Sequence, residues 1–178
     1  FQALDADAVM IIEAPDSGKS YNTVTALEAF AQRFSLRARA AVMGFSNDTQ
    51  QEIALLYDPD AISAAHTPFG DFVGPEGATG APRFDTALRI DLDIDATEDF
   101  VVFSKPPLEL NITTKGGFAF HMIGAHLKSK APHGATTPAE VMSIGIANRR
   151  KQLAQAVWMR ARIEEHLSKG TPLMVMGD

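Results

Sequence analysis

Residues 107–129 read PLELNITTKGGFAFHMIGAHLKS. Gly116 and Gly117 divide this stretch, and two successive glycines are typical of a tight turn because glycine tolerates positive φ angles. Apolar residues alternate on both sides of that pair: Leu108, Leu110 and Ile112 before it, and Phe118, Phe120 and Met122 after it. Alternation with a period of two is the pattern of a strand that buries one face. The stretch therefore predicts an antiparallel β-hairpin.

Further strands and helices surround this hairpin. Short apolar runs bounded by turn residues predict buried strands at 7–12, 38–45, 52–58 and 172–176. Apolar residues at helical spacing predict helices at 23–34 and at about 146–168. Two stretches without periodicity predict long loops that shape access to a site, at 61–83 and 129–147. The order of elements predicts an α/β (α+β) fold in which antiparallel pairs are mixed in.

Length and composition set the outer limits. The chain has 178 residues, enough for a single domain over 1–178, and 46% hydrophobic with 21% charged residues is ordinary globular composition. No apolar run reaches the roughly 18 residues of a membrane span. The absence of cysteine excludes disulfides and thiolate metal sites. A net charge of −6 argues against binding of duplex nucleic acid by bulk charge, but leaves room for a locally basic cleft or for divalent cations.

Gly18, Lys19 and Ser20 end a stretch that resembles a phosphate-binding loop. That motif requires another glycine five residues before Gly18, where this chain has Glu13. A carboxylate there would repel phosphate, so the three residues are interpreted as a polar connection between strand and helix. Glu13 itself directly follows a buried strand, where an acid either lies in a cleft or is paired, because a buried unpaired charge is costly. The alternative is a surface glutamate just beyond the strand.

Two further polar residues end core strands. His126 follows the second strand of the hairpin, and Asp178 follows the last apolar run. By itself, His126 is interpreted either as a site residue or as a hydrogen-bonded core histidine. His121, five residues before His126, falls on the opposite face of that strand, so the two are not expected to share a metal, and His121 is interpreted as structural or edge-facing. Side-chain oxygens from strand ends suit a hard cation such as Mg²⁺ or Mn²⁺, whereas a zinc site is less favoured in a chain without cysteine.

Several stretches, in order, resemble the endonuclease/exonuclease/phosphatase superfamily of metal-dependent phosphoesterases. They cover essentially the whole chain: DADAVMIIE (5–13), QEIALLYDPD (51–60), SKPPLEL (104–110), FHMIGAHLKS (120–129), NRRKQLAQA (148–156) and PLMVMGD (172–178). The resemblance implies a deoxyribonuclease-I-like sandwich of two sheets flanked by helices. It also implies a metal-dependent phosphodiester hydrolase, most similar to the nucleases of the group. The substrate implied is a phosphodiester, above all nucleic acid, and no protein partner is indicated.

The resemblance also implies a role for individual residues. Glu13 corresponds to the glutamate that holds Mg²⁺, with Mn²⁺ or Ca²⁺ as substitutes, and Asp178 to the aspartate that positions the attacking water. His126 corresponds to the histidine that donates to the phosphate or to the leaving oxygen. Glu52 lies near the acid that orients this histidine in some members, although Gln51 competes for that alignment. The basic residues that correspond to phosphate contacts are Lys105 and Arg149, with Arg150 beside it.

The chain also departs from the family pattern. Ile12 stands where the family has a glutamine. The first strand of the fold and the later strands, which carry an asparagine and an Asp-His pair, have no counterpart among these residues. The chain is therefore expected to be an incomplete fragment that is inactive by itself. A phosphatase or phospholipid phosphodiesterase of the same fold and a catalytically inactive binding module stay open as alternatives, and the sequence does not indicate a compartment.

Overall fold

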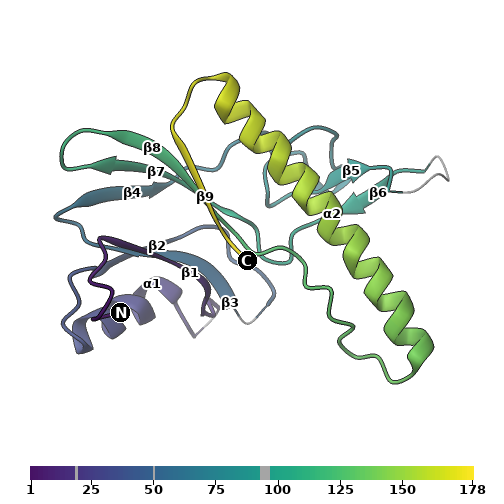
Figure 1. Ribbon diagram of the computed structural model, residues 1–178, viewed down its shortest axis with the longest axis horizontal. Helices are drawn as coiled ribbons and strands as arrows, with labels where there is room; N and C mark the ends of the chain where they lie inside the picture. The colour runs from purple at the N-terminus through teal and green to yellow at the C-terminus, as the bar shows by residue number, and fades with distance from the viewer. Residues whose placement is uncertain (19, 50, 93–96) are drawn as a thin grey trace. The chain divides into compact units, whose positions relative to one another are not determined.

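The computed structural model describes residues 1–18, 20–49, 51–92 and 97–178 (Figure 1). The chain divides into two compact units. Unit 1 comprises 1–69, 104–126 and 166–178, and unit 2 comprises 70–103 and 127–165. Both contain strands and helical residues, so the predicted mixed α/β class is confirmed.

Unit 1 contains two sheets. The first has three antiparallel strands, in the order β1 (Ala8–Pro15), β3 (Gln51–Tyr57) and β2 (Ala40–Met43). The second has four, in the order β4 (Ile62–His66), β7 (Leu108–Thr114), β8 (Ala119–Ala125) and β9 (Leu173–Gly177). Only β8 and β9 run parallel to each other. Four of these strands, β1, β2, β3 and β9, correspond to the four buried runs expected from the sequence.

The two sheets of unit 1 face each other across a shared hydrophobic cluster. Its buried members come from β3, β7 and β8: Ile53, Leu55, Leu108, Leu110, Ile112 and Met122. Gly124 of β8 brings the sheets close together, because a Cβ atom there would lie 2.5 Å from Sδ of Met10 on β1. Burial of these side chains is the main stabilising contribution, at roughly 1.5–3 kcal/mol for each large aliphatic residue.

The other face of the first sheet is covered by α1 (Thr23–Arg33). Asn22 begins the helix, since its side chain accepts a hydrogen bond from the Thr25 amide at 2.9 Å. Leu27 and Ala31 of the helix pack with Ala54 and Leu56 of β3. Successive residues of β3 thus alternate between the helix and the opposite sheet, and this alternation decides the orientation of the polar residues at the start of β3.

The hairpin predicted from 107–129 is confirmed. β7 and β8 pair in antiparallel register from Leu108 with Gly124 to Thr113 with Ala119. The Thr114 amide donates to the Phe118 carbonyl at 2.9 Å, and Gly117 has a φ of 84°. A left-handed φ at this turn position is the conformation that favours glycine.

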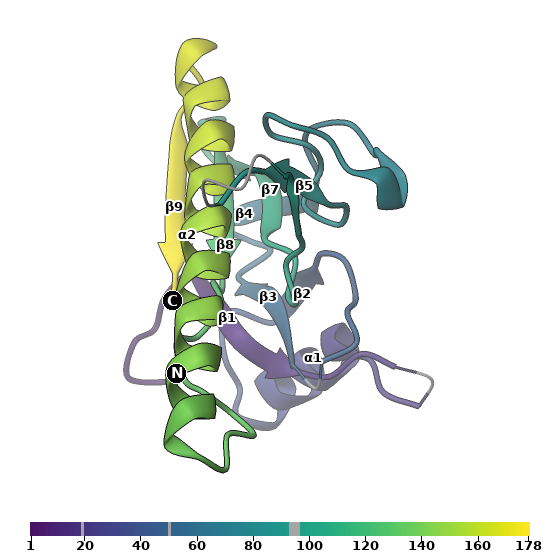
Figure 2. The ribbon, with the colours of Figure 1, turned by 90° about the vertical axis from the view of Figure 1, so that its right-hand side faces the viewer.

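Unit 2 contains two short strands, a 3₁₀ turn and most of the long helix: β5 (Leu88–Ile90), β6 (Asp99–Val101), η1 (Gly74–Glu76) and α2 (Pro138–Ser168). Figure 2 shows α2 as one continuous helix. Trp158 is fully buried against Phe84 and Phe103, and its Nε1 donates to the Pro82 carbonyl at 2.9 Å. Arg162, also fully buried, donates to the same carbonyl at 3.0 Å and lies over the Phe84 ring. Within the described ranges, no helix combines the length and apolar character needed to cross a membrane.

Two expectations from the sequence are wrong. The region 61–83 is not irregular throughout, because β4 pairs with β7 as an edge strand. The long helix begins at Pro138 rather than near 146. A capping box starts it: the Glu140 amide donates to Oγ1 of Thr137 at 3.2 Å, and the Glu140 carboxylate accepts from the Thr137 amide at 2.9 Å. Proline is favoured in the first turn of a helix, so Pro138 supports the same start.

Candidate functional site

Two of the predicted site residues follow neighbouring strands of unit 1. β8 and β9 run parallel, with Ala125 opposite Gly177, and His126 and Asp178 are the next residue of each. The Asp178 amide donates to the Ala125 carbonyl at 3.0 Å. The carboxyl ends of parallel strands lie at the same edge of a sheet, so the histidine and the aspartate are brought together there.

Gly177 makes this close approach of the two strands feasible. Its φ is 148°, and a Cβ atom at this position would lie 1.9 Å from the Ala125 carbonyl oxygen. A side chain of any size would collide with the backbone of β8. The glycine thus fixes the point at which Asp178 leaves the sheet.

Lys105 connects this edge with the other sheet of unit 1. It lies just before β7, whose start is beside the end of β8 because the two strands are antiparallel. Its Nζ donates to Oε1 of Gln51 on β3 at 2.7 Å and lies 3.2 Å from Nδ1 of His126. An ammonium group is a donor only, so Nδ1 accepts and Nε2 carries the imidazole proton. His126 thereby presents an N–H group on the side of the ring away from Lys105.

Glu13 is oriented by a β-bulge. The pairing of β1 with β3 shifts between Ile11 and Ala14, and both of these residues pack beneath α1 although they are three positions apart. Regular alternation would place residues three positions apart on opposite faces of the strand. The extra residue of the bulge brings Ile11 and Ala14 onto the same face. Glu13, next to Ala14, therefore points away from α1, and its side chain is exposed. Bulges commonly re-aim side chains beside functional sites.

Glu52 lies on the face of β3 that α1 covers. It follows the alternation of Ala54 and Leu56, and it is completely buried. Its Oε2 accepts a hydrogen bond from the Asn47 side chain, while its Oε1 has no hydrogen-bond partner among the residues that the structure describes. Burial raises the pKa of Glu52, and the nearby Asp16 carboxylate raises it further, against the opposing effect of backbone N–H groups.

Gln51, rather than Glu52, is therefore the β3 residue linked to His126. It precedes Glu52 and so lies on the opposite face, towards the second sheet, where Lys105 reaches it. The sequence contains a signal for this orientation, because QQEIALL places position 51 in phase with the apolar residues Ile53 and Leu55. Whether Gln51 or Glu52 is directed towards His126 depends on which set of alternating β3 residues faces the second sheet.

Arg149, the other predicted phosphate contact, lies in unit 2. It belongs to α2 and its side chain is exposed. The residues that unit 1 itself brings together are thus His126, Lys105 and Asp178, with Glu13 on the facing sheet.

The resemblance implies a divalent cation, and the side chains available as its ligands decide which ion fits. Within the described ranges, no three histidine, aspartate or glutamate side chains lie together as a set of metal ligands. Glu13 provides one exposed carboxylate. Mg²⁺ commonly keeps several waters and binds through one or two carboxylates together with substrate phosphate, so these residues fit that ion. They do not fit zinc, which takes three or four protein ligands.

Unit 1 therefore places a lysine ammonium group, an imidazole N–H group and the exposed Asp178 carboxylate at one edge, and it carries the exposed Glu13 carboxylate on the facing sheet. Such a set can neutralise an anionic substrate, donate a hydrogen bond to it and orient water. Comparison of the chain with protein-family models, curated proteins and solved structures finds no match. The chemistry of these residues is accordingly the basis for assigning a function.

Proposed function

We propose that the chain carries the site of a metal-dependent phosphodiester hydrolase of the endonuclease/exonuclease/phosphatase type. The proposed fold is the deoxyribonuclease-I-like sandwich, and the proposed substrate is nucleic acid. One observation supports this most strongly: Lys105 contacts His126 at 3.2 Å, and the strands beside them place His126 and Asp178 at one edge. A cation, a histidine that donates a hydrogen bond and a carboxylate can together stabilise the developing charge, protonate the leaving oxygen and orient the attacking water in hydrolysis of a phosphodiester.

The histidine is the donor in this proposal. Lys105 holds Nδ1, so the Nε2 proton of His126 lies on the side of the ring away from Lys105 and can be donated to a nonbridging oxygen or to the leaving oxygen. The Lys105 ammonium adds positive charge beside the developing anion, and Gln51 fixes its position. Gln51 is then a positioning residue, a role that the resemblance associated with Glu52.

The carboxylates have separate tasks. Asp178, exposed at the end of β9, accepts a proton from the attacking water and orients it. Glu13 would hold Mg²⁺ or Mn²⁺, and the bound ion would neutralise charge on the nonbridging oxygens. Glu52 is separated from these residues by its orientation towards α1, where its carboxyl group is buried.

The activity can be tested on the complete gene product with four substrates: supercoiled plasmid DNA, single-stranded RNA, a phospholipid and a phosphomonoester. Hydrolysis of a nucleic acid in Mg²⁺, abolished by EDTA, is expected. Preferential hydrolysis of the phospholipid or the phosphomonoester would instead identify another enzyme of the same fold. Absence of hydrolysis with all four substrates would overturn the proposal and favour a binding module.

The histidine is tested by substitution. His126→Gln should lower kcat by about 100-fold or more, the usual effect of losing a proton donor. His133→Gln is the matched control, because His133 is an exposed histidine outside the site. Equal loss of activity in both variants would contradict the role of His126.

A further inference from the structure

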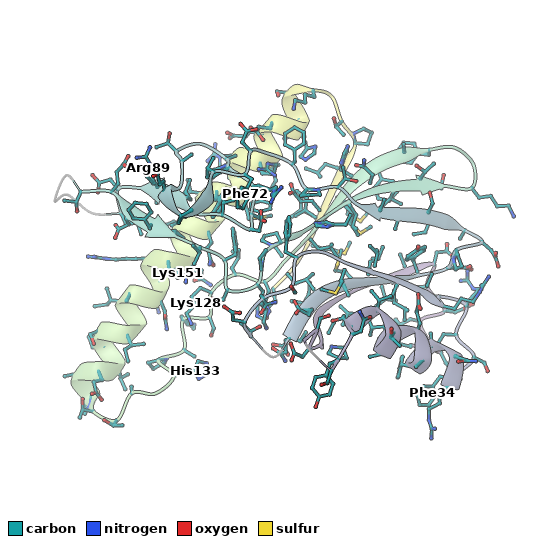
Figure 3. All side chains as sticks on the ribbon, turned by 180° about the vertical axis from the view of Figure 1, so that it is seen from behind. Phe34, Phe72, Arg89, Lys128, His133 and Lys151 are labelled. Atoms are coloured by element: carbon teal, nitrogen blue, oxygen red, sulfur yellow. The ribbon has the colours of Figure 1, made fainter. Side chains whose placement is uncertain are left out.

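Unit 2 contains a pair of lysines that lie side by side. The segment that follows β8 runs along α2: the Lys128 amide donates to Oε1 of Gln155 at 2.7 Å, and the Asn148 side chain donates to the Ala131 carbonyl at 2.8 Å. Lys151 lies between Asn148 and Gln155 on the same face of the helix, one turn from each. The segment therefore passes directly over Lys151, and Lys128 and Lys151 are neighbours (Figure 3).

The position of this lysine pair is well defined. Gln155 is buried, and its Nε2 donates to the Val102 carbonyl at 3.0 Å, so one side chain connects the backbone at Lys128 with the end of β6. Lys128 and Lys151 are each half-buried. Their proximity thus results from backbone contacts rather than from the chance placement of two long surface side chains.

Within the described residues, no ion pair balances the charge of the pair. No acidic side chain forms an ion pair with Lys128 or Lys151 in the described ranges. Burial lowers the pKa of Lys151, and the charge of Lys128 lowers it further. Holding two ammonium groups together in a partly dry place is unfavourable unless an anion joins them. A phosphate group, with several acceptor oxygens, is suited to both at once.

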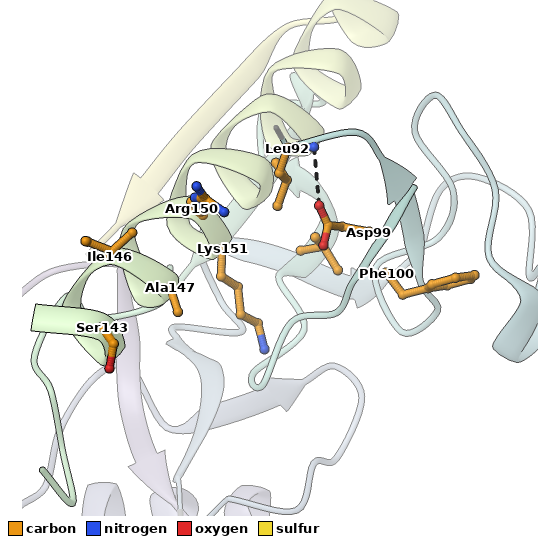
Figure 4. Close-up of a pocket in the computed structure, with 9 residues that line it drawn as sticks. Leu92, Asp99, Phe100, Ser143, Ile146, Ala147, Arg150 and Lys151 are labelled. Carbon is orange, nitrogen blue, oxygen red and sulfur yellow. Dashed lines mark hydrogen bonds between the residues drawn. The ribbon is translucent and has the colours of Figure 1, made fainter. Parts of the chain in front are cut away.

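A pocket of about 500 Å³ adjoins Lys151 (Figure 4). It lies between α2 and β6, and Lys151 is part of its wall. Its apolar lining comes from Val101, Ile146 and Ala147, and Phe100 presents a largely exposed ring at its side. A volume of this size matches ligand sites of roughly 300–1,000 Å³.

The pocket also offers a polar group away from the lysines. Oδ2 of Asp99 accepts from the Leu92 amide at 3.3 Å, which leaves the other carboxylate oxygen able to accept from a ligand N–H group. A ligand that fits all three features has a phosphate, a flat apolar body and an N–H donor.

We propose that Lys128, Lys151 and this pocket bind a nucleotide, with its phosphate between the two lysines and its base against Phe100. The nucleotide is either free or one unit of a nucleic-acid strand. The phosphate site is inferred from the geometry of unit 2 alone. The idea that it binds a substrate strand rests on the proposed function. Base stacking on an aromatic ring adds affinity for any of the bases, so the site is expected to be tolerant of sequence.

Binding should be measured by calorimetry in EDTA, so that no hydrolysis takes place. The probes are inorganic phosphate, adenosine, adenosine 5′-monophosphate and a short single-stranded DNA. Adenosine 5′-monophosphate should bind more tightly than phosphate or adenosine. Lys151→Gln and Lys128→Gln should each weaken its binding about tenfold and reduce the salt dependence by about one charge.

Lys115→Gln is the matched control, because Lys115 is an exposed lysine in the β7–β8 turn of unit 1. It should leave binding unchanged. Thermal melting provides the folding control: neutralising one member of a cation pair should leave the melting temperature unchanged or raise it. Tighter binding of the strand than of the mononucleotide would identify the strand as the ligand, and equal binding would identify the free nucleotide.

Unchanged binding in both lysine variants would overturn the proposal, and so would the absence of phosphate and nucleotide binding in the unaltered protein. Equal affinity for phosphate and for adenosine 5′-monophosphate would overturn the assignment of a nucleotide. These results are distinguishable from a failure of the proposed function, because hydrolysis depends on Glu13 and His126 in unit 1 and is measured separately.

Discussion

Substitution of Gly177 by alanine tests how the edge that carries Asp178 is built. The added Cβ would lie 1.9 Å from the Ala125 carbonyl oxygen, a backbone atom that cannot rotate away. The φ of 148° is also unfavourable for alanine. The end of β9 must therefore separate from β8, and the hydrogen bond from the Asp178 amide to Ala125 is lost with it.

The expected cost is the sum of these two effects. A residue forced into a sparsely populated backbone region costs about 1–3 kcal/mol. The lost hydrogen bond adds about 0.5–1.5 kcal/mol. Gly177→Ala should thus destabilise the protein by roughly 2–4 kcal/mol, which lowers the melting temperature of a chain of this size by roughly 5–15 °C.

Thermal melting followed by circular dichroism measures the effect. Gly145→Ala is the matched control, because Gly145 lies within α2 and a Cβ atom there meets nothing within 4 Å. That change should stabilise the protein by about 0.5–1 kcal/mol, the helix preference of alanine over glycine. If Gly177→Ala melts at the same temperature as the unaltered protein, the close pairing of β8 and β9 is refuted.

Three other substitutions test separate parts of the structure. Burial raises the pKa of Glu52, so the ionised Glu52 side chain destabilises the folded protein. This cost is absent in acid and grows as the pH rises above 4.5, the ordinary pKa of a glutamate. Glu52→Gln should therefore raise the melting temperature above neutral pH and lose this advantage in acid, and an equal effect at both pH values would contradict the burial of an unpaired oxygen. Hydrogen bonds from Thr136 and Thr137 lower the pKa of Glu140 to about 2, so its stabilising effect is lost as pH falls from 4.5 towards 2. Glu140→Gln should lower the melting temperature at neutral pH but not near pH 2, and destabilisation that persists in acid would argue against the capping box. Lys105→Met should lower kcat by about 100-fold with little change in melting temperature, whereas activity within about twofold of the unaltered protein would remove Lys105 from the site.

The elements with strong local patterns could be predicted from the sequence. The hairpin followed from alternating apolar residues around Gly116 and Gly117, two signals that agree. β4 was missed because Ile62–His66 alternates only weakly and is held by pairing with β7, a contact distant in sequence. The start of α2 was missed because Thr137 and Glu140 lie in a stretch without apolar periodicity, although together they form a capping box.

The sequence shows which candidate site residues follow strands, but not which of them contact one another. His126 and Asp178 each follow an apolar run, which is visible in the sequence. The bulge that turns Glu13 away from α1 depends on the register between β1 and β3 and leaves no local signal. The choice of Gln51 over Glu52 likewise depends on which face of β3 meets the second sheet, and that is decided by the packing of α1 on the other face.

Under the proposed function, Glu13 supports metal-dependent cleavage of a phosphodiester. The most direct measurement is the rate at which the complete gene product cleaves a fluorescently labelled oligonucleotide in Mg²⁺, for the unaltered protein, Glu13→Gln and the control Glu76→Gln. Glu76 is an exposed glutamate of η1 in unit 2, so its loss should have no effect. With the proposed role of Glu13, cleavage should require Mg²⁺, fall by about 100-fold or more in Glu13→Gln and stay unchanged in Glu76→Gln. Cleavage by Glu13→Gln at the rate of the unaltered protein would contradict that role.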